Sequence, residues 1–216
     1  ERAAEPAPVD EKIVTPSFRP IAWAIAACAV VMLTIFATSQ LQQPVTVATL
    51  ISNEDAAWES SLPTMPGSKL TAGMLTLKSG MSTIRFESGA ELVLEAPALL
   101  ELVDSMRGRL IAGNAVIDVP ESAIGFVIET PDGYAVDYGT QFAVRVDEQR
   151  QRSDFELIKG EIAVHHPETG DEVRLTEQGK MASVSKQALV VTSAGAQEPA
   201  DESEARTLRI RTNGRS

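Results

Sequence analysis

The sequence predicts an all-β domain preceded by a single membrane-spanning helix. The helix is indicated by the apolar run at residues 21–37, IAWAIAACAVVMLTIFA, because no charged residue lies between Arg19 and Glu54. The β domain is indicated by short runs rich in Val, Ile, Leu, Phe and Thr between Met74 and Val191, separated by turn residues at fairly even spacing. We expect a two-sheet sandwich or a short β-solenoid.

Residues 1–19 are rich in Ala, Pro and Glu and show no apolar period. This composition predicts a disordered tail or linker, because such a segment cannot bury a core. The sequence begins with Glu1 rather than Met, so we expect it to be an excerpt of a longer chain.

The membrane helix is predicted at residues 20–39. A helix rises about 1.5 Å per residue, so the apolar run spans roughly 25 Å, the short end of what crosses a bilayer core. Basic residues precede the run at Arg2, Lys12 and Arg19, and the next one is Lys69. Positive charge favours the cytoplasmic side, so we expect a cytoplasmic N-terminus and a periplasmic domain after the helix.

Three other interpretations of the apolar run are open. It is a cleaved signal peptide if Ala37 and Ser39 form the cleavage site, although a long acidic leader precedes it. It is a lipoprotein anchor if Cys28 is lipidated, although the run continues nine residues past that cysteine. A buried core helix is disfavoured, because a helix apolar on every face has little to pack against in a small domain.

The predicted β domain covers residues 40–192. Apolar and polar residues alternate there, as in Phe142, Val144 and Val146 against Gln141 and Arg145, which predicts strands with one buried face. The more continuous runs at 98–103 and 126–128 predict strands covered on both faces. A turn of helix is expected around Trp58, within residues 53–61.

Gly and Asn mark the expected turns between strands, because they tolerate positive φ. The expected turns are Ser79-Gly80, Ser88-Gly89, Gly113-Asn114, Pro131-Asp132-Gly133, Tyr138-Gly139, Lys159-Gly160, Glu168-Thr169-Gly170 and Gln178-Gly179. Residues 193–216 hold few apolar side chains and are predicted to be a disordered linker.

Charge and residue counts argue against several functions. The net charge of -11 disfavours binding to nucleic acid, which needs clustered Lys and Arg. One cysteine excludes an internal disulfide. The two histidines, His165 and His166, are adjacent in a predicted strand and are expected to be exposed, so they cannot act together. We predict no catalytic residue, no cofactor and no metal site, and the chain is not expected to be an enzyme.

Three segments carry a resemblance to a known family. They read FVIETPDGYAVDYGTQF at 126–142, LIKGEIAV at 157–164 and VRLTEQG at 173–179. Together they resemble the FecR domain, and the likeness extends over about residues 45–184. The motif residues are Phe126, Thr130, Gly139, Thr140, Phe142, Gly160 and Gly179. Structural roles are expected for them: Gly139 permits a kink, the Thr140 hydroxyl bonds back to the turn, and Phe142 enters the core.

The resemblance implies an inner-membrane regulator of the anti-sigma type. In such a protein a cytoplasmic segment controls an extracytoplasmic-function sigma factor, and a periplasmic FecR domain receives or relays a signal by protein-protein contact. Nineteen N-terminal residues are too few for a sigma-binding domain, so we expect that domain upstream of Glu1. The alternative is a non-catalytic envelope scaffold that presents a further domain beyond Ser216.

Overall fold

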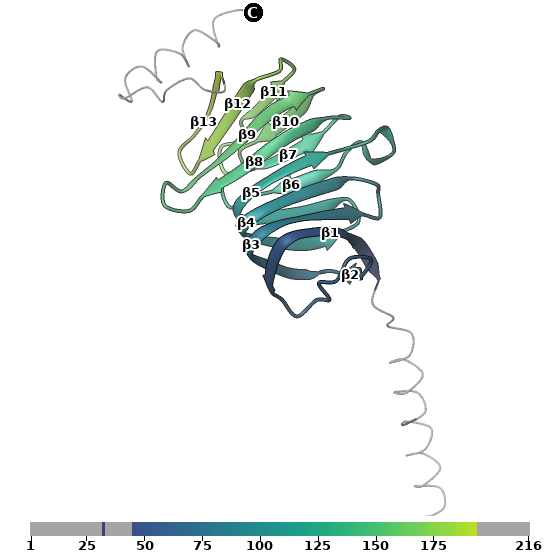
Figure 1. The fold of residues 1–216 in the computed structure, drawn as a ribbon. Coiled ribbons are helices and arrows are strands. Elements are labelled where there is room, and N and C mark those ends of the chain that lie inside the picture. Colours follow the sequence, from purple (N-terminus) through teal and green to yellow (C-terminus); the bar gives the residue numbers. More distant parts are fainter. Residues whose placement is uncertain (1–31, 33–44, 194–216) are drawn as a thin grey trace, which may run out of the picture. The chain divides into compact units, whose positions relative to one another are not determined.

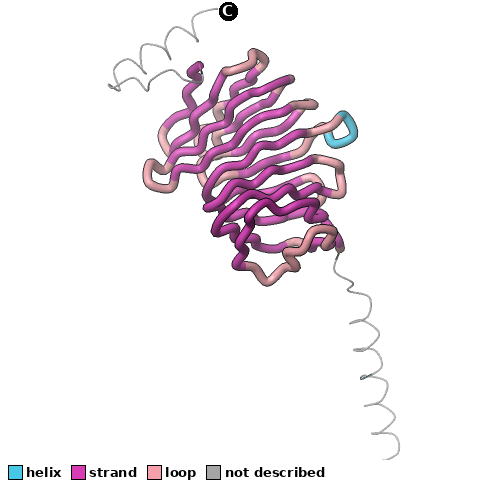
Figure 2. Tube along the Cα trace, viewed as in Figure 1, coloured by secondary structure: helices cyan, strands magenta, loops and turns pink. Residues whose placement is uncertain are grey.

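The computed structural model describes Met32 and residues 45–193, where the prediction of an all-β domain is confirmed (Figure 1; Figure 2). The predicted tail, the predicted membrane helix apart from Met32, and residues 194–216 of the predicted linker lie outside the described residues. Within the described part of the chain, no helix is long and apolar enough to cross a bilayer. The helical element that is described, η1 (Glu121–Ala123), is a single 3-10 turn.

Thirteen strands form one continuous, branched sheet. They are β1 (Thr46–Glu59), β2 (Lys69–Thr71), β3 (Gly73–Phe86), β4 (Glu91–Asp104), β5 (Arg107–Asp118), β6 (Val127–Glu129), β7 (Tyr134–Asp137), β8 (Gln141–Asp147), β9 (Arg152–Lys159), β10 (Ile162–His165), β11 (Glu172–Leu175), β12 (Lys180–Ser185) and β13 (Ala188–Ser193).

The sheet branches at β5. The first half of β5 pairs in parallel with β6, and this branch continues through β7 and β10 to β11. The second half pairs antiparallel with β8, and this branch continues through β9 and β12 to β13. The two branches stack as the layers of a sandwich, which we call the β6 layer and the β8 layer (Figure 1).

The long strands β3, β4 and β5 pass from one layer to the other through corners. The pairing of β4 with β5 is interrupted between Glu95↔Asn114 and Leu99↔Ala112. Gly113 sits at this corner with φ +96°, and a Cβ there would meet the carbonyl oxygen of Pro97. Only glycine fits such a close backbone approach at positive φ.

The core lies between the two layers. Its largest fully buried side chains include four phenylalanines, Phe86, Phe126, Phe142 and Phe155. Phe86 ends β3 in the β8 layer, and its ring packs edge-on against Phe126, with centroids 4.8 Å apart and planes at 67°. Edge-to-face packing places a positive ring edge on a negative ring face, so this pair joins the layers with defined geometry.

Two expectations about local structure are wrong. No helical turn surrounds Trp58, because strand β1 continues to Glu59 and Trp58 pairs with Leu77 of β3.

The run at residues 98–103 of β4 alternates between buried and half-buried side chains, so only one face of this strand is fully covered by the rest of the domain. The run at 126–128 alternates in the same way. Most of these half-buried outer positions hold leucine or valine (Leu99, Val103 and Val127), which made the pattern look continuously apolar, and Glu101 is the charged exception.

Two of the expected turns are also wrong. Ser79-Gly80 lies inside β3 and Gly113-Asn114 lies inside β5. Both glycines have positive φ, as expected, but they bend a strand around a corner instead of reversing the chain. The other expected turns fall between consecutive strands, except that Lys159 is still the last residue of β9.

Candidate functional site

Most of the FecR-like motif residues hold two turns of the domain and part of its core. Phe126 and Phe142 are fully buried. Thr130 closes the β6–β7 turn, because its hydroxyl and its backbone N–H both donate to the Gly133 carbonyl oxygen, at 2.9 and 2.8 Å. Gly179 has φ +75° and donates its N–H to the Leu157 carbonyl oxygen at 2.9 Å. These contacts make the residues structural elements of the fold.

The β7–β8 turn is built around a buried carboxylate that the sequence analysis missed. Asp137 ends β7 and is fully buried, and its Oδ2 accepts a hydrogen bond of 2.6 Å from the Gly139 N–H. The Thr140 hydroxyl does not bond back to the turn as expected, since it has no partner. Gly160, with φ +92°, packs directly against Gly139 and Thr140. Gly139 and Thr140 therefore lie at the carboxylate, and Gly160 packs against both of them from the β9–β10 turn.

Asp137 is protonated more easily than an ordinary aspartate. Burial raises its pKa from 3.8 to about 6, and Asp118 adds to the increase, while the N–H groups of Gly139 and Thr140 oppose it. The folded state therefore binds a proton more tightly than the unfolded state. The contribution of Asp137 to the free energy of unfolding is therefore greatest below pH 4 and is lost as the pH rises towards 6.

Asp137→Asn is expected to remove this pH dependence. The amide oxygen still accepts the two N–H groups, but no charge is buried at neutral pH. The variant should gain about 2–3 kcal/mol of unfolding free energy relative to wild type between pH 4 and pH 7. Urea unfolding of both chains across this range measures the difference, and a difference that stays constant with pH would contradict the assignment.

A buried histidine links the two layers. His166 was expected to be exposed, but it is 2% exposed, because its ring is hydrogen-bonded between the β10–β11 turn and β12. Its Nδ1 accepts the N–H groups of Glu168 and Thr169 at 3.2 and 3.3 Å. The proton therefore sits on Nε2, which donates to the Ser185 carbonyl oxygen at 2.8 Å. His165 was also expected to be exposed, but it is half-buried and stacks on Tyr134, with ring centroids 4.6 Å apart.

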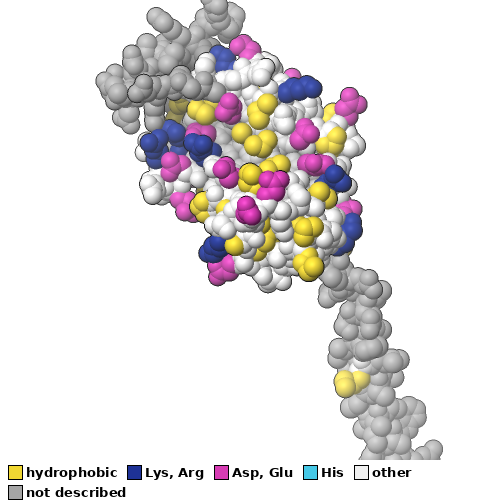
Figure 3. Space-filling model, in the orientation of Figure 1, with side chains coloured by type: hydrophobic (Ala, Val, Ile, Leu, Met, Phe, Trp, Pro, Cys, Tyr) yellow, Lys and Arg dark blue, Asp and Glu magenta, His cyan; other side chains and the backbone are white. Residues whose placement is uncertain are grey.

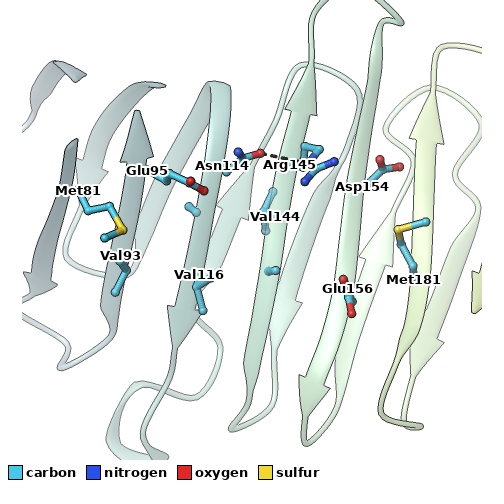
Figure 4. Close-up of a pocket in the computed structure, with 12 residues that line it drawn as sticks. Met81, Val93, Glu95, Asn114, Val116, Val144, Arg145, Asp154, Glu156 and Met181 are labelled. Atoms are coloured by element: carbon cyan, nitrogen blue, oxygen red, sulfur yellow. Dashed lines mark hydrogen bonds between the residues drawn. The ribbon is translucent and has the colours of Figure 1, made fainter. Parts of the chain in front are cut away.

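The outer face of the β8 layer carries a shallow groove of about 420 Å³. Its lining side chains come from six strands, β3, β4, β5, β8, β9 and β12 (Figure 4). Over this face, apolar and acidic side chains are interspersed (Figure 3). We call this surface the β8-layer groove.

One side of the groove is a polar row. Strand pairing aligns Glu95, Asn114, Arg145 and Asp154 on four neighbouring strands. Arg145 Nε donates to the Asn114 side-chain oxygen at 3.2 Å, and Asp154 accepts a 2.6 Å hydrogen bond from the hydroxyl of Ser183. These hydrogen bonds hold much of the polar row in place.

The adjacent row is largely apolar. Strand pairing aligns Val93, Val116, Ala143, Glu156 and Met181. Val93 is 38% exposed. The other members of the row are half-buried. A partly exposed apolar strip bordered by ordered polar groups is typical of a protein contact surface.

The described residues show no grouping of side chains that could bind a metal ion. Among Met32 and residues 45–193, no three His, Cys, Asp or Glu side chains are grouped closely enough to hold a metal ion. The arrangement at Asp137 holds a turn, and the β8-layer groove offers contact area. We therefore take the groove as the candidate functional site.

Comparisons with known proteins agree with this picture of the fold. Residues 73–163 match the family model described as FecR protein. No curated protein matches the chain. Two crystal structures of a candidate anti-sigma factor from Parabacteroides distasonis, at 2.50 and 1.65 Å resolution, match with TM-scores of 0.50 and 0.49.

Both structures are 13% identical to this chain, and each match covers 66% of this chain and 65% of the other. At that identity, the match with a TM-score of 0.50 shows a shared fold. The family model covers the strands from β3 to the first residues of β10 and includes every motif residue except Gly179. The chain therefore contains a FecR domain, which the family model places at residues 73–163.

Proposed function

We propose that the chain is a single-pass inner-membrane regulator of the anti-sigma type. In this proposal residues 20–39 cross the membrane, the FecR domain lies in the periplasm, and a cytoplasmic segment upstream of Glu1 controls an extracytoplasmic-function sigma factor. The domain works by protein-protein contact and without catalysis.

The observation that carries the proposal is the order of two features along the chain. An uncharged apolar run at residues 21–37 directly precedes a domain that matches the FecR family. Basic residues lie only on the N-terminal side of that run until Lys69, which favours export of the β domain on its C-terminal side. The anti-sigma description of the solved structure that matches with a TM-score of 0.50 supports the same role.

The β8-layer groove supports contact as the mode of action. Its apolar row is partly exposed, and much of its polar row is ordered by hydrogen bonds within the domain. A partner that covers the groove would bury apolar surface while meeting polar groups already held in place, which lowers the entropy cost of binding.

Binding to a sigma factor tests the regulatory part of the proposal. The chain with its native upstream region should retain a sigma factor of its host in a pull-down from detergent-solubilised membranes. The same chain without the upstream region is the control and should retain none. Failure of the complete protein to bind any sigma factor of its host would contradict the proposal.

A further inference from the structure

In the described part of the chain, the sheet ends at three strands, β2, β11 and β13. Residues 52–59 of β1 also lack a second partner strand, and they carry three acidic side chains. Proteins protect such edges with short strands or charged residues, because unpaired N–H and C=O groups invite another strand. β2 has three residues and begins with Lys69, and β11 carries Glu172 and Arg174. β13 has six residues, ALVVTS, and none of them is charged. By these criteria β13 is the unprotected edge.

An apolar side chain at this edge faces the core but lacks cover. Val191 pairs with Ala182, which is fully buried, so both side chains point to the inner face of the β8 layer. Val191 is nevertheless 39% exposed. A further strand beside β13 would both pair its free backbone groups and cover this valine.

The chain contains a segment with the required pattern. Residues 207–212 read TLRIRT, which places Leu208 and Ile210 on one face of an extended strand and Arg209 and Arg211 on the other. The thirteen residues at 194–206 connect it to β13, and an extended connection of that length reaches roughly 40 Å. A connection of that length allows residues 207–212 to reach the edge of β13.

Charge favours the same pairing. The range 45–193 holds 22 acidic and 12 basic residues, whereas residues 206–215 hold four arginines and no acidic residue. On the outer face of the β8 layer, Asp154 and Glu156 lie two strands from β13.

We infer that residues 207–212 add to β13 as an antiparallel strand, with Leu208 and Ile210 over Val191 and the two arginines on the acidic outer face.

Hydrogen exchange in the 216-residue chain tests this inference. Half of the β13 N–H groups point away from β12, and the added strand would protect them. In Leu208→Asp/Ile210→Asp, exchange of residues 188–193 should become at least ~10-fold faster, while β4 keeps its wild-type rates. The matched control, Thr207→Asp/Asn213→Asp, adds the same charge on the opposite face and should leave β13 protected.

Two results would overturn the inference. Equal exchange of β13 in wild type and in Leu208→Asp/Ile210→Asp would show that the segment does not cover the edge. Protection that increases with protein concentration and accompanies a dimer in sedimentation would assign the edge to a second copy of the chain.

Discussion

Gly160→Ala is expected to destabilise the FecR domain by about 3–4 kcal/mol. Gly160 has φ +92°, a conformation that costs an L residue about 1–2 kcal/mol. A Cβ there would lie 2.6 Å from the Gly139 carbonyl oxygen and 2.5 Å from Thr140 Cγ2. Because one of these atoms belongs to the backbone, the β7–β8 turn itself has to move, which adds the cost of overpacking.

Gly179→Ala is the matched control. Gly179 also has positive φ, +75°, but a Cβ there would meet nothing within 4 Å. It should cost only about 1–2 kcal/mol, the conformational part of the penalty. Chemical denaturation followed by circular dichroism compares the two variants. Equal losses would show that the β9–β10 turn does not pack against the turn that Asp137 holds.

The fold class was predictable because it depends on local patterns. Alternation in runs such as 142–146 identifies strands with one buried face, and glycine positions identify changes of direction. Glycine alone does not say which change occurs. Gly113 needs positive φ at a corner within β5 just as Gly139 needs it in a turn between strands, so the sequence supports both interpretations equally.

The Asp137 site was less predictable, although a signal was present. Asp137 follows Ala135 by two residues in β7, and the same strand face is buried. An acidic residue at a core-facing position next to Gly139 and Thr140 indicates a carboxylate that accepts backbone N–H groups. His166 lacked such a signal, because its burial depends on Ser185, nineteen residues away.

The β8-layer groove was not predictable from the sequence. Its rows join residues as distant as Val93 and Met181, and their alignment depends on the branching of the sheet at β5. Strand order is set by contacts across the whole domain, which no local pattern encodes. The polar and apolar rows appear only when β4, β5, β8, β9 and β12 are in register.

Removal of residues 21–37 is expected to move the chain from the membrane to the soluble fraction. These seventeen residues are uncharged and mostly apolar, so they favour the lipid bilayer over water. Cys28→Ser is the matched control, because it tests a lipid anchor while leaving the apolar run intact. That variant should stay in the membrane.

Fractionation of the unmodified chain tests the central claim most directly. After alkaline extraction the chain should remain in the membrane pellet at its full length, and protease added to the periplasmic side should reach the β domain. Recovery of the intact, unprocessed chain in the soluble fraction without detergent would contradict the claim that this FecR domain belongs to a membrane-anchored regulator.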